Sequence, residues 1–432
     1  MNSWLKYIDR WMIPVLLLAT AYLAFNNQRN ATYNSYQDVI WADAAGYHMY
    51  WPGLLLYDGY EGDLYPEGIQ QQIGNGFHFD DSTGRAVTKY TYGVALMQTP
   101  FFLAAHAGAA IAGEPTTGYS RFYYWAVMLA AVCYGMLGLM VLKRYLRRRF
   151  SLRSALLTTF FIYLGTNLYY YMIDDSGMSH AYSFFLFALV LDYTDRYYNK
   201  GSIKNLLGIA IPLGLAVIIR PTSAVIVVFI LFYHHERFPS VGQRFLFWFK
   251  RMHHVGIIAV VAALFWVPHL VYNHHVTGIW QLWTYTDEGF IYATAPKFAE
   301  VFMSPMSGML PYVPMMAILF LALIAMSFRR KSNIWPLLFV LIVVTYLFAS
   351  WHAWHFGCSF GQRSYVEYLP LLAIPLTWLF DQAFSRNRLY VIALAGVLLL
   401  ASIYTLQLAY AYDECYFGNV WDYEKYWGYF DR

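Results

Sequence analysis

Long apolar runs separated by short polar segments dominate the sequence. Many of these runs approach the ~20 residues that a helix needs to cross a bilayer. We therefore predict an all-α polytopic membrane protein with about eleven transmembrane helices. The runs lie at residues 11–25, 122–142, 153–172, 178–194, 205–219, 222–233, 255–272, 309–327, 334–350, 366–381 and 389–405.

Basic residues beside these runs predict how the chain is threaded. Lys6 and Arg10 precede the first run, and a dense basic cluster, residues 143–149, follows the second. Because Lys and Arg are enriched in short cytoplasmic loops, we expect a cytoplasmic N-terminus and a C-terminus outside. A further apolar run, residues 92–112, would reverse this order if it crossed. We therefore expect it to form a pair of helices in the outer membrane interface.

The chain shows no repeat, linker or soluble extra domain. We expect a single transmembrane domain over residues 1–405, in which residues 26–121 form the first outer loop with interfacial helices. Residues 406–432 would form a short extracytoplasmic tail. The first run lacks a small-residue cleavage site, so we interpret it as a retained span and not as a signal peptide.

Composition agrees with a membrane protein, since 59% of the 432 residues are hydrophobic and only 12% are charged, against about 25% in soluble domains. Aromatic residues reach 20%, which suits both membrane interfaces and the stacking of sugars. The net charge of +4 and the lack of a basic patch with interleaved aromatics argue against nucleic acid. Three cysteines cannot form a disulfide framework. Cys358 and Cys415 could pair if their Cα atoms lie within ~7 Å.

The expected threading brings many ionisable residues to the outer ends of the spans. Such groups are costly in a membrane and usually face a cavity or a partner. We therefore predict one polar site that opens to the outside. Its candidates are Asp43, Lys89, Asp174, Asp175, His180, Arg220, His352, His355, Arg363 and Glu367.

The acidic candidates have two interpretations each. Asp43 could cap the helix that follows it, or act as a general base toward an incoming hydroxyl. Asp174 and Asp175 could cap the next helix, or supply a second acidic group to the site. Together with His180, these three carboxylates could bind Mg²⁺ or Mn²⁺, but no diagnostic ligand spacing is present.

Arg220 lies between two apolar runs and precedes a proline. It could pair with Asp174 or Asp175, or its planar guanidinium could bind a phosphate. Residues 280–290 form an aromatic-rich outer segment that suits sugar stacking or a membrane belt equally well.

The segment from Trp351 to Pro370 combines two histidines, two tryptophans and Arg363 at the start of a helix. A phosphate at a helix N-terminus meets free backbone N–H groups, so Arg363 and His355 could hold a phosphate leaving group. The alternative is an aromatic belt at the membrane interface, in which Glu367 simply pairs with Arg363.

Four segments in this order resemble the GT-C glycosyltransferases, which are polytopic enzymes that use polyprenyl-phosphate-linked sugars. Relatives in that class include protein O-mannosyltransferases and the lipid A aminoarabinose transferase. The likeness extends over residues 1–405, although each motif is loose. It is carried by Asp43–Tyr50, by Lys89–Gly93, by Asp174 or Asp175, and by Gln362–Pro370.

The resemblance implies roles for individual residues. Asp43 would be the catalytic base, and Arg363 would contact the donor phosphate with His355, Lys89 and Arg220 in support. Asp174 or Asp175 would be the second acid, although two adjacent acids depart from the single residue often seen there. We expect the chain to lack the C-terminal periplasmic domain that many relatives carry. The candidate substrate-binding residues are Tyr47, Tyr92, His180, His352, Trp354 and Glu367.

These features predict transfer of a sugar from a polyprenyl-phosphate donor to an acceptor hydroxyl on a protein, lipid or glycan, with inversion. The site would face outward from a bilayer, expected to be a bacterial cytoplasmic (inner) membrane. One alternative is a ligase that moves a whole lipid-linked glycan. Another is a transporter or flippase with an outward cavity, but such proteins tend to show internal repeats and midplane charges.

Overall fold

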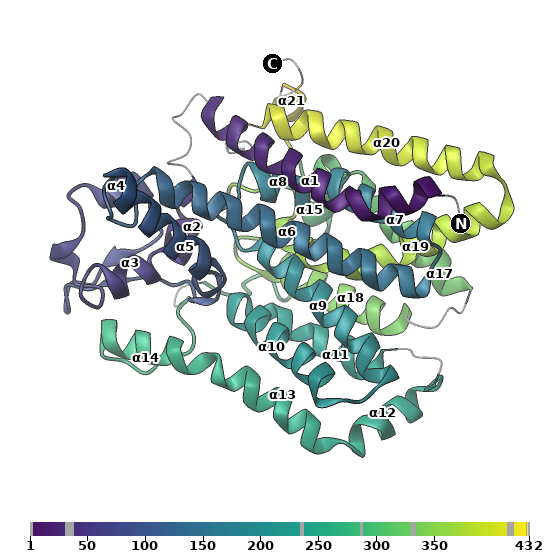
Figure 1. The fold of residues 1–432 in the computed structure, drawn as a ribbon, viewed down its shortest axis with the longest axis horizontal. Coiled ribbons are helices and arrows are strands. Elements are labelled where there is room, and N and C mark those ends of the chain that lie inside the picture. The colour runs from purple at the N-terminus through teal and green to yellow at the C-terminus, as the bar shows by residue number, and fades with distance from the viewer. Residues whose placement is uncertain are drawn as a thin grey trace.

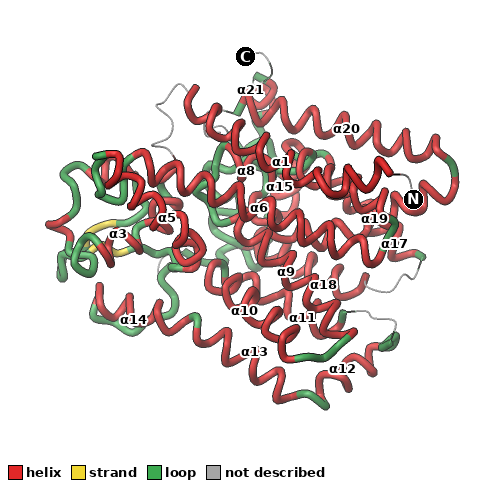
Figure 2. Tube along the Cα trace, viewed as in Figure 1, coloured by secondary structure: helices red, strands yellow, loops and turns green. Residues whose placement is uncertain are grey.

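The computed structural model describes residues 3–30, 39–233, 237–285, 288–329, 334–412, 419–428 and 430. Helices make up nearly all of the regular structure in these ranges (Figures 1 and 2). The exception is a small antiparallel hairpin in which β1 (His78–Phe79) pairs with β2 (Ala86–Val87). The predicted all-α class is therefore correct apart from this hairpin.

Every apolar run predicted as a span contains helix within the described residues, although several runs are broken into two helices. The helices are α1 (Ser3–Asn30), α6 (Arg121–Arg149), α7 (Leu152–Leu164), α8 (Leu168–Ile173), α9 (His180–Asn199), α10 (Ile203–Ile219), η3 (Pro221–Val225), α11 (Ile226–Phe232), α13 (Met252–Leu264), α14 (Trp266–Thr277), α16 (Met309–Tyr312), α17 (Met315–Phe328), α18 (Ile334–Ser350), η4 (Arg363–Tyr368), α19 (Leu369–Arg386) and α20 (Arg388–Ala411).

Five helical segments of the described chain are long and apolar enough to cross a membrane, and five further apolar helices are shorter. The outward faces of the long helices remain apolar: Leu18 on α1 is 72% exposed and Leu400 on α20 is 69% exposed. Exposed aliphatic surface on this scale requires a nonaqueous environment. The protein is thus an integral membrane protein.

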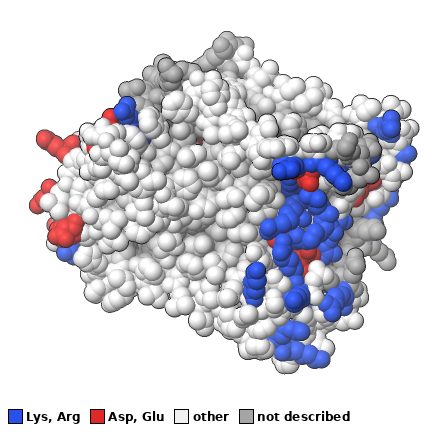
Figure 3. Space-filling view, in the orientation of Figure 1, with Lys and Arg blue, Asp and Glu red and all other residues white. Residues whose placement is uncertain are grey.

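Charged side chains gather at opposite ends of the molecule (Figure 3). Lys143, Arg144, Arg148 and Arg149 form one basic end, where the buried Asp192 and Asp195 of α9 pair with the three arginines. A broad band with almost no charge separates this basic end from acidic side chains at the far end. If the basic end is cytoplasmic, the opposite end faces outward.

The segment between α1 and α6 builds a subdomain at the end of α6 opposite the basic end. It contains α2 (Asp43–His48), α3 (Tyr50–Leu55), η2 (Gly62–Leu64), α4 (Ile69–Ile73) and the hairpin. Its last element is α5 (Gly93–Ala112). The predicted helix pair at 92–112 is wrong, because α5 runs unbroken through Pro100. It packs antiparallel to the first half of α6, where Tyr134 donates to the Met97 carbonyl over 2.8 Å.

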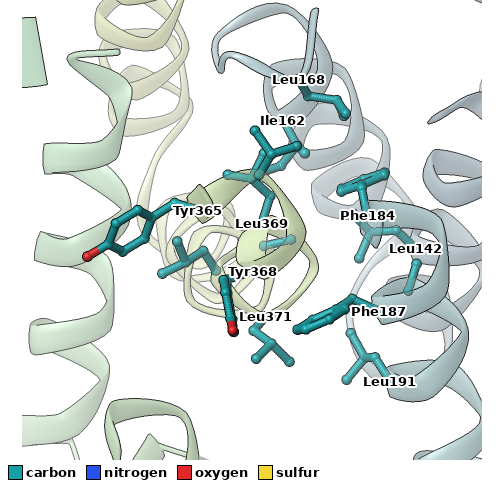
Figure 4. Packing of buried hydrophobic residues seen from close by; sticks show 14 of the residues in the cluster. Leu142, Ile162, Leu168, Phe184, Phe187, Leu191, Tyr365, Tyr368, Leu369 and Leu371 are labelled. Carbon is teal, nitrogen blue, oxygen red and sulfur yellow. The ribbon is translucent and has the colours of Figure 1, made fainter. Parts of the chain in front are cut away.

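Two clusters of buried hydrophobic side chains stabilise the helix bundle and the subdomain. The larger one lies within the helix bundle, where Leu142 of α6, Phe184 and Phe187 of α9, and Tyr368 and Leu369 at the start of α19 converge (Figure 4). The Phe187 and Tyr368 rings meet edge to face at 5.0 Å. The smaller cluster fills the subdomain and includes Tyr272 and Val276 of α14.

The remaining helices are α12 (Val241–Phe249), α15 (Phe298–Met303) and α21 (Tyr423–Trp427). α20 continues through residue 405 to Ala411, and the Tyr426 ring of α21 is buried beside Tyr312 and Tyr404. The boundary at 405 stays a prediction. Cys133 is unpaired, whereas Cys358 is disulfide-bonded. Cys415, its possible partner in the sequence analysis, lies outside the described residues.

Candidate functional site

A pocket of about 530 Å³ opens between the subdomain and the bundle. Its polar wall carries five acidic or basic side chains besides His352, and they come from distant parts of the chain: Asp43, Lys89, Arg220, Glu288 and Arg363. Its other walls are apolar or aromatic. They come from the end of α10 and η3 (Ile219, Pro221, Val225), from residues 283–290 (Trp283, Tyr285, Phe290), and from the end of α18 with the following loop (Leu347, Phe348, Trp351, Phe356).

Asp43 opens α2, and its carboxylate points away from the helix backbone. The N-cap residue is Ala42, and no side chain caps this helix, so the capping interpretation of Asp43 is wrong. Oδ2 instead accepts a hydrogen bond from Arg363 Nη2 at 2.8 Å, and Oδ1 accepts one from the Tyr90 hydroxyl. Both carboxylate oxygens are thus oriented by side chains that line the same pocket.

The turn before Asp43 is strained. Ala42 has a φ of 47°, a left-handed value that residues with a Cβ rarely adopt. The Ala42 N–H donates to the Ile73 carbonyl of α4 at 2.8 Å, which holds the turn in place. Strained backbone of this kind is concentrated at functional sites, and here it delivers the Asp43 carboxylate to the pocket.

Arg220 directly follows α10, and its guanidinium contacts two residues of η4. Its Nη2 donates to Ser364 Oγ at 2.7 Å, and its Nε lies 3.3 Å from Glu367 Oε1. The second carboxylate oxygen of Glu367 lies 3.5 Å from His180 Nδ1. The expected pairing of Arg220 with Asp174 or Asp175 is therefore wrong, as is that of Glu367 with Arg363.

His180 and Glu367 were expected to contact substrate, but neither lines the pocket. Both side chains are completely buried. A buried carboxylate needs a compensating charge, and Arg220 supplies it. Glu367 thus fixes the guanidinium of Arg220 while that residue lines the pocket.

We expect Glu367→Gln to lower the free energy of unfolding by roughly 3 kcal/mol or more, because breaking a buried ion pair leaves the other charge uncompensated. The matched control is Glu61→Gln, which removes a partly exposed ion pair with Arg85. This substitution should lower the free energy of unfolding by at most about 1 kcal/mol. Thermal unfolding of the purified variants in detergent measures both. Equal melting temperatures for the two variants would contradict the structural role of Glu367.

Asp174 and Asp175 lie in the loop between α8 and α9, and neither lines the pocket. α9 begins at His180 with Ser179 as its N-cap and no side-chain cap bond, so the capping interpretation of the two acids is wrong. Burial raises the pKa of Asp174 to about 8, with a contribution from the charge of Asp175. Burial also raises the pKa of Asp175 to about 7, although the positive charge of Arg363 opposes that rise.

These pKa values predict a pH-dependent stability. Unfolded Asp ionises near pH ~3.9, so between that pH and about 8 the folded state binds more protons at Asp174 than the unfolded state does. Stability should therefore fall as pH rises through this window. Asp174→Asn should flatten the fall in melting temperature between pH 5 and pH 9, whereas Asp81→Asn, at an exposed position, should leave it unchanged. A parallel fall in wild type and Asp174→Asn would refute the prediction.

The other predicted residues divide between the pocket and its surroundings. Lys89, Tyr47 and His352 line the pocket. Lys89 pairs with Glu288, and Tyr47 packs on Tyr90 with ring centroids 4.9 Å apart.

Three further predicted residues, in addition to His180, Glu367, Asp174 and Asp175, do not line the pocket. Trp354 is buried, the Tyr92 hydroxyl donates to the Phe265 carbonyl, and His355 Nδ1 accepts the Gly357 N–H at 3.0 Å. His355 therefore does not join Arg363 in the pocket, contrary to expectation.

Sequence reasoning did not single out Tyr90 or Glu288, although both side chains make polar contacts within the site. Tyr90, which orients Asp43, lies within the Lys89–Gly93 motif, so that motif could have identified it. Glu288 lies between the aromatic residues Tyr285 and Phe290, and no pattern in the sequence indicates its pairing with Lys89. Trp283, Tyr285 and Phe290 of the same segment do line the pocket.

The residues considered for a divalent cation do not form a metal site. Within the described ranges, no group of three or more His, Cys, Asp or Glu side chains could hold a metal ion. Asp43 is bound by Arg363, and His180 lies beside Glu367. The set of Asp43, Asp174, Asp175 and His180 is therefore not assembled.

The sequence matches no family model and no curated protein. Among solved structures, the fold is similar to the apo crystal structure of the oligosaccharyltransferase from Archaeoglobus fulgidus, with a TM-score of 0.52 and 13% identity. The match covers 95% of this chain but only 57% of that one. A second structure of the enzyme, AglB with an inhibitory peptide and a dolichol-phosphate, gives a TM-score of 0.49 at 11% identity and covers 94% and 56% of the two chains. The fold of this chain thus resembles the part of the Archaeoglobus fulgidus oligosaccharyltransferase that the first match covers.

Proposed function

We propose that the protein is a membrane glycosyltransferase of the GT-C type, which transfers a sugar from a polyprenyl-phosphate donor to an acceptor hydroxyl. The observation that carries this proposal is the contact of Asp43 with Arg363 in one pocket. It brings together a base for the acceptor and a cation for the leaving phosphate. The similarity of the fold to an oligosaccharyltransferase supports the same class of reaction.

The reaction is a single displacement with inversion. The acceptor oxygen attacks the anomeric carbon and passes its proton to Asp43, while the bond from that carbon to the phosphate oxygen breaks. The electron pair of this bond leaves with the phosphate. Arg363 and Arg220 stabilise the phosphate as its charge grows, since positioned cations act most strongly where charge develops. The Tyr90 hydroxyl keeps the carboxylate of Asp43 in one orientation.

The arginine geometry suits a phosphate ester. Only 12% of the Arg363 side chain and 16% of the Arg220 side chain are exposed, so both guanidinium groups act where water screens them little. A planar guanidinium also binds phosphate oxygens in pairs. Lys89 adds a third cation at a more exposed position.

The apolar wall suits the lipid part of the donor. Val225, Leu347 and Phe348 line the pocket, so a polyprenyl chain can leave the phosphate along them toward the bilayer. Trp283 and Tyr285 offer aromatic faces to the sugar. With the basic end in the cytoplasm, the pocket would face outward from a bacterial cytoplasmic (inner) membrane toward an acceptor protein, lipid or glycan.

A whole-glycan ligase is the second candidate, because the similar solved structure is an oligosaccharyltransferase. The pocket volume of about 530 Å³ lies inside the range of roughly 300–1,000 Å³ for small-molecule sites. This size favours one sugar with its phosphate. The ionisable groups at one end of the bundle also favour an enzyme over a transporter with midplane charges.

The test is transfer by the purified protein in proteoliposomes with labelled polyprenyl-phosphate sugars. We expect release of polyprenyl phosphate and label in the acceptor fraction with a single-sugar donor. Activity only with an oligosaccharide donor would support the ligase instead. Movement of intact donor between leaflets without release of phosphate would identify a transporter and overturn the proposal.

A further inference from the structure

A second groove, of about 690 Å³, lies between α3, α5 and α14. It shares no lining residue with the Asp43 pocket. Its inner wall consists of the aromatic side chains of Tyr50, Trp51, Tyr60, Tyr92 and Tyr272. Its outer edge consists of the aliphatic residues Leu54, Leu96 and Val271.

The inner wall is apolar in effect, although every aromatic residue in it carries a polar atom. Each of these atoms already donates to a backbone carbonyl. The Tyr50 hydroxyl donates to the Tyr90 carbonyl, and the Trp51 indole N–H donates to the Ala95 carbonyl. The hydroxyls of Tyr60, Tyr92 and Tyr272 donate to the carbonyls of Tyr50, Phe265 and Ala86, respectively. A sugar or peptide in the groove would lose most of its hydrogen bonds to water, because these side chains have no free hydrogen left to donate to it. A hydrocarbon chain would lose none.

The edge of the groove meets the apolar outer surface of the protein. Val271 is 52% exposed and Leu54 is 51% exposed. Val271 belongs to the 26-residue apolar segment Met252–Thr277, which is long enough to cross a membrane. A lipid in the surrounding bilayer can therefore enter the groove from the side.

One end of the groove is polar and acidic. Asp58 and His275 are the two residues of the lining, apart from tyrosines, that can ionise. Asp58 is exposed in a turn with φ of 39°, followed by Gly59 at 72°. His275 Nε2 and the Gly59 carbonyl are 2.9 Å apart. The nearby cation Arg85 is neutralised by Glu61. No ion pair or hydrogen bond to the Asp58 carboxylate occurs among the described residues.

We propose that this groove binds a membrane phospholipid whose headgroup carries a primary amine. The acyl chain would lie along the aromatic wall, and the ammonium group would pair with the Asp58 carboxylate at the polar end. The acidic end selects a cationic group, and the apolar wall with its open side selects a chain supplied by the bilayer. The site is independent of the proposed transfer reaction.

The test is native mass spectrometry of the full chain released from nanodiscs with equal amounts of phosphatidylethanolamine and phosphatidylglycerol. We expect one retained phosphatidylethanolamine per protein. Asp58→Asn should lower its affinity about tenfold, because a charge-assisted hydrogen bond is lost. Asp81→Asn, another exposed acid of the subdomain, is the matched control and should bind as the wild type does.

A second pair of variants tests the location. Val271→Trp should fill the mouth of the groove and abolish retention of the lipid. Val267→Trp lies one turn earlier on the same helix, is 51% exposed and does not line the groove, so it should retain the lipid. Equal retention of the two phospholipids, or retention unchanged in both Asp58→Asn and Val271→Trp, would overturn the proposal. Displacement of the lipid by polyprenyl phosphate would assign the groove to the donor chain instead.

Discussion

Replacing Asp43 with Asn is expected to lower the rate of sugar transfer by about 10²- to 10⁴-fold, the usual contribution of a general base. The amide keeps the size of the side chain and can still accept hydrogen bonds through its oxygen. It cannot take the proton of the acceptor hydroxyl at neutral pH. The initial rate of label transfer in proteoliposomes measures the effect at saturating donor.

Two controls distinguish the loss of a catalytic base from a general loss of charge or of donor binding. Asp81→Asn removes an exposed carboxylate from the same subdomain and should transfer at the wild-type rate. Donor binding by Asp43→Asn, measured without acceptor, should stay within a few-fold of the wild type because the cations of the pocket are intact. A normally folded Asp43→Asn protein that transfers at the wild-type rate would exclude Asp43 as the base.

Arg363→Gln should give the second large loss, about 10²- to 10³-fold in kcat, as is typical when a group that stabilises developing charge is removed. Its guanidinium lies against Asp43 and is almost enclosed, so water screens its charge little. Arg121→Gln is the matched control, since it breaks an arginine–glutamate pair with Glu114 outside the pocket.

Arg363 also orients Asp43, and a double-mutant cycle separates the two roles. If Arg363 acted only by orienting Asp43, adding Arg363→Gln to Asp43→Asn would not lower the rate of sugar transfer any further. Because we assign Arg363 to the phosphate as well, the double variant should be at least about tenfold slower than Asp43→Asn alone. A double variant as fast as Asp43→Asn would remove Arg363 from the phosphate site.

The sequence predicted the helices well because the signal for a membrane span is local. A run such as residues 389–405 is long and apolar by itself, and it lies within α20. The local sequence predicted the structure of the 92–112 run wrongly. Pro100 suggested a break, yet α5 continues through it, since packing against α6 decides whether a helix with a central proline stays continuous.

Side-chain partners were harder to predict than positions. The expected threading placed Asp43 and Arg363 in one site, the resemblance to a family gave each a role, and the two side chains do meet. Arg220 was expected to pair with Asp174 or Asp175, but its partner is Glu367. Which carboxylate reaches a guanidinium depends on helix rotation and loop path, and these arise from tertiary packing that no local pattern encodes.

Asp43 and Arg363 are separated by 320 positions in the chain. Because the ribosome adds residues one at a time, Arg363 is synthesised well after Asp43. At about 5–20 residues per second, the ribosome makes Arg363 roughly 16–64 s after Asp43. For that interval the carboxylate has been made but its guanidinium partner has not. A nascent chain that stops anywhere before η4 therefore lacks the partner, however many of its helices are already inserted.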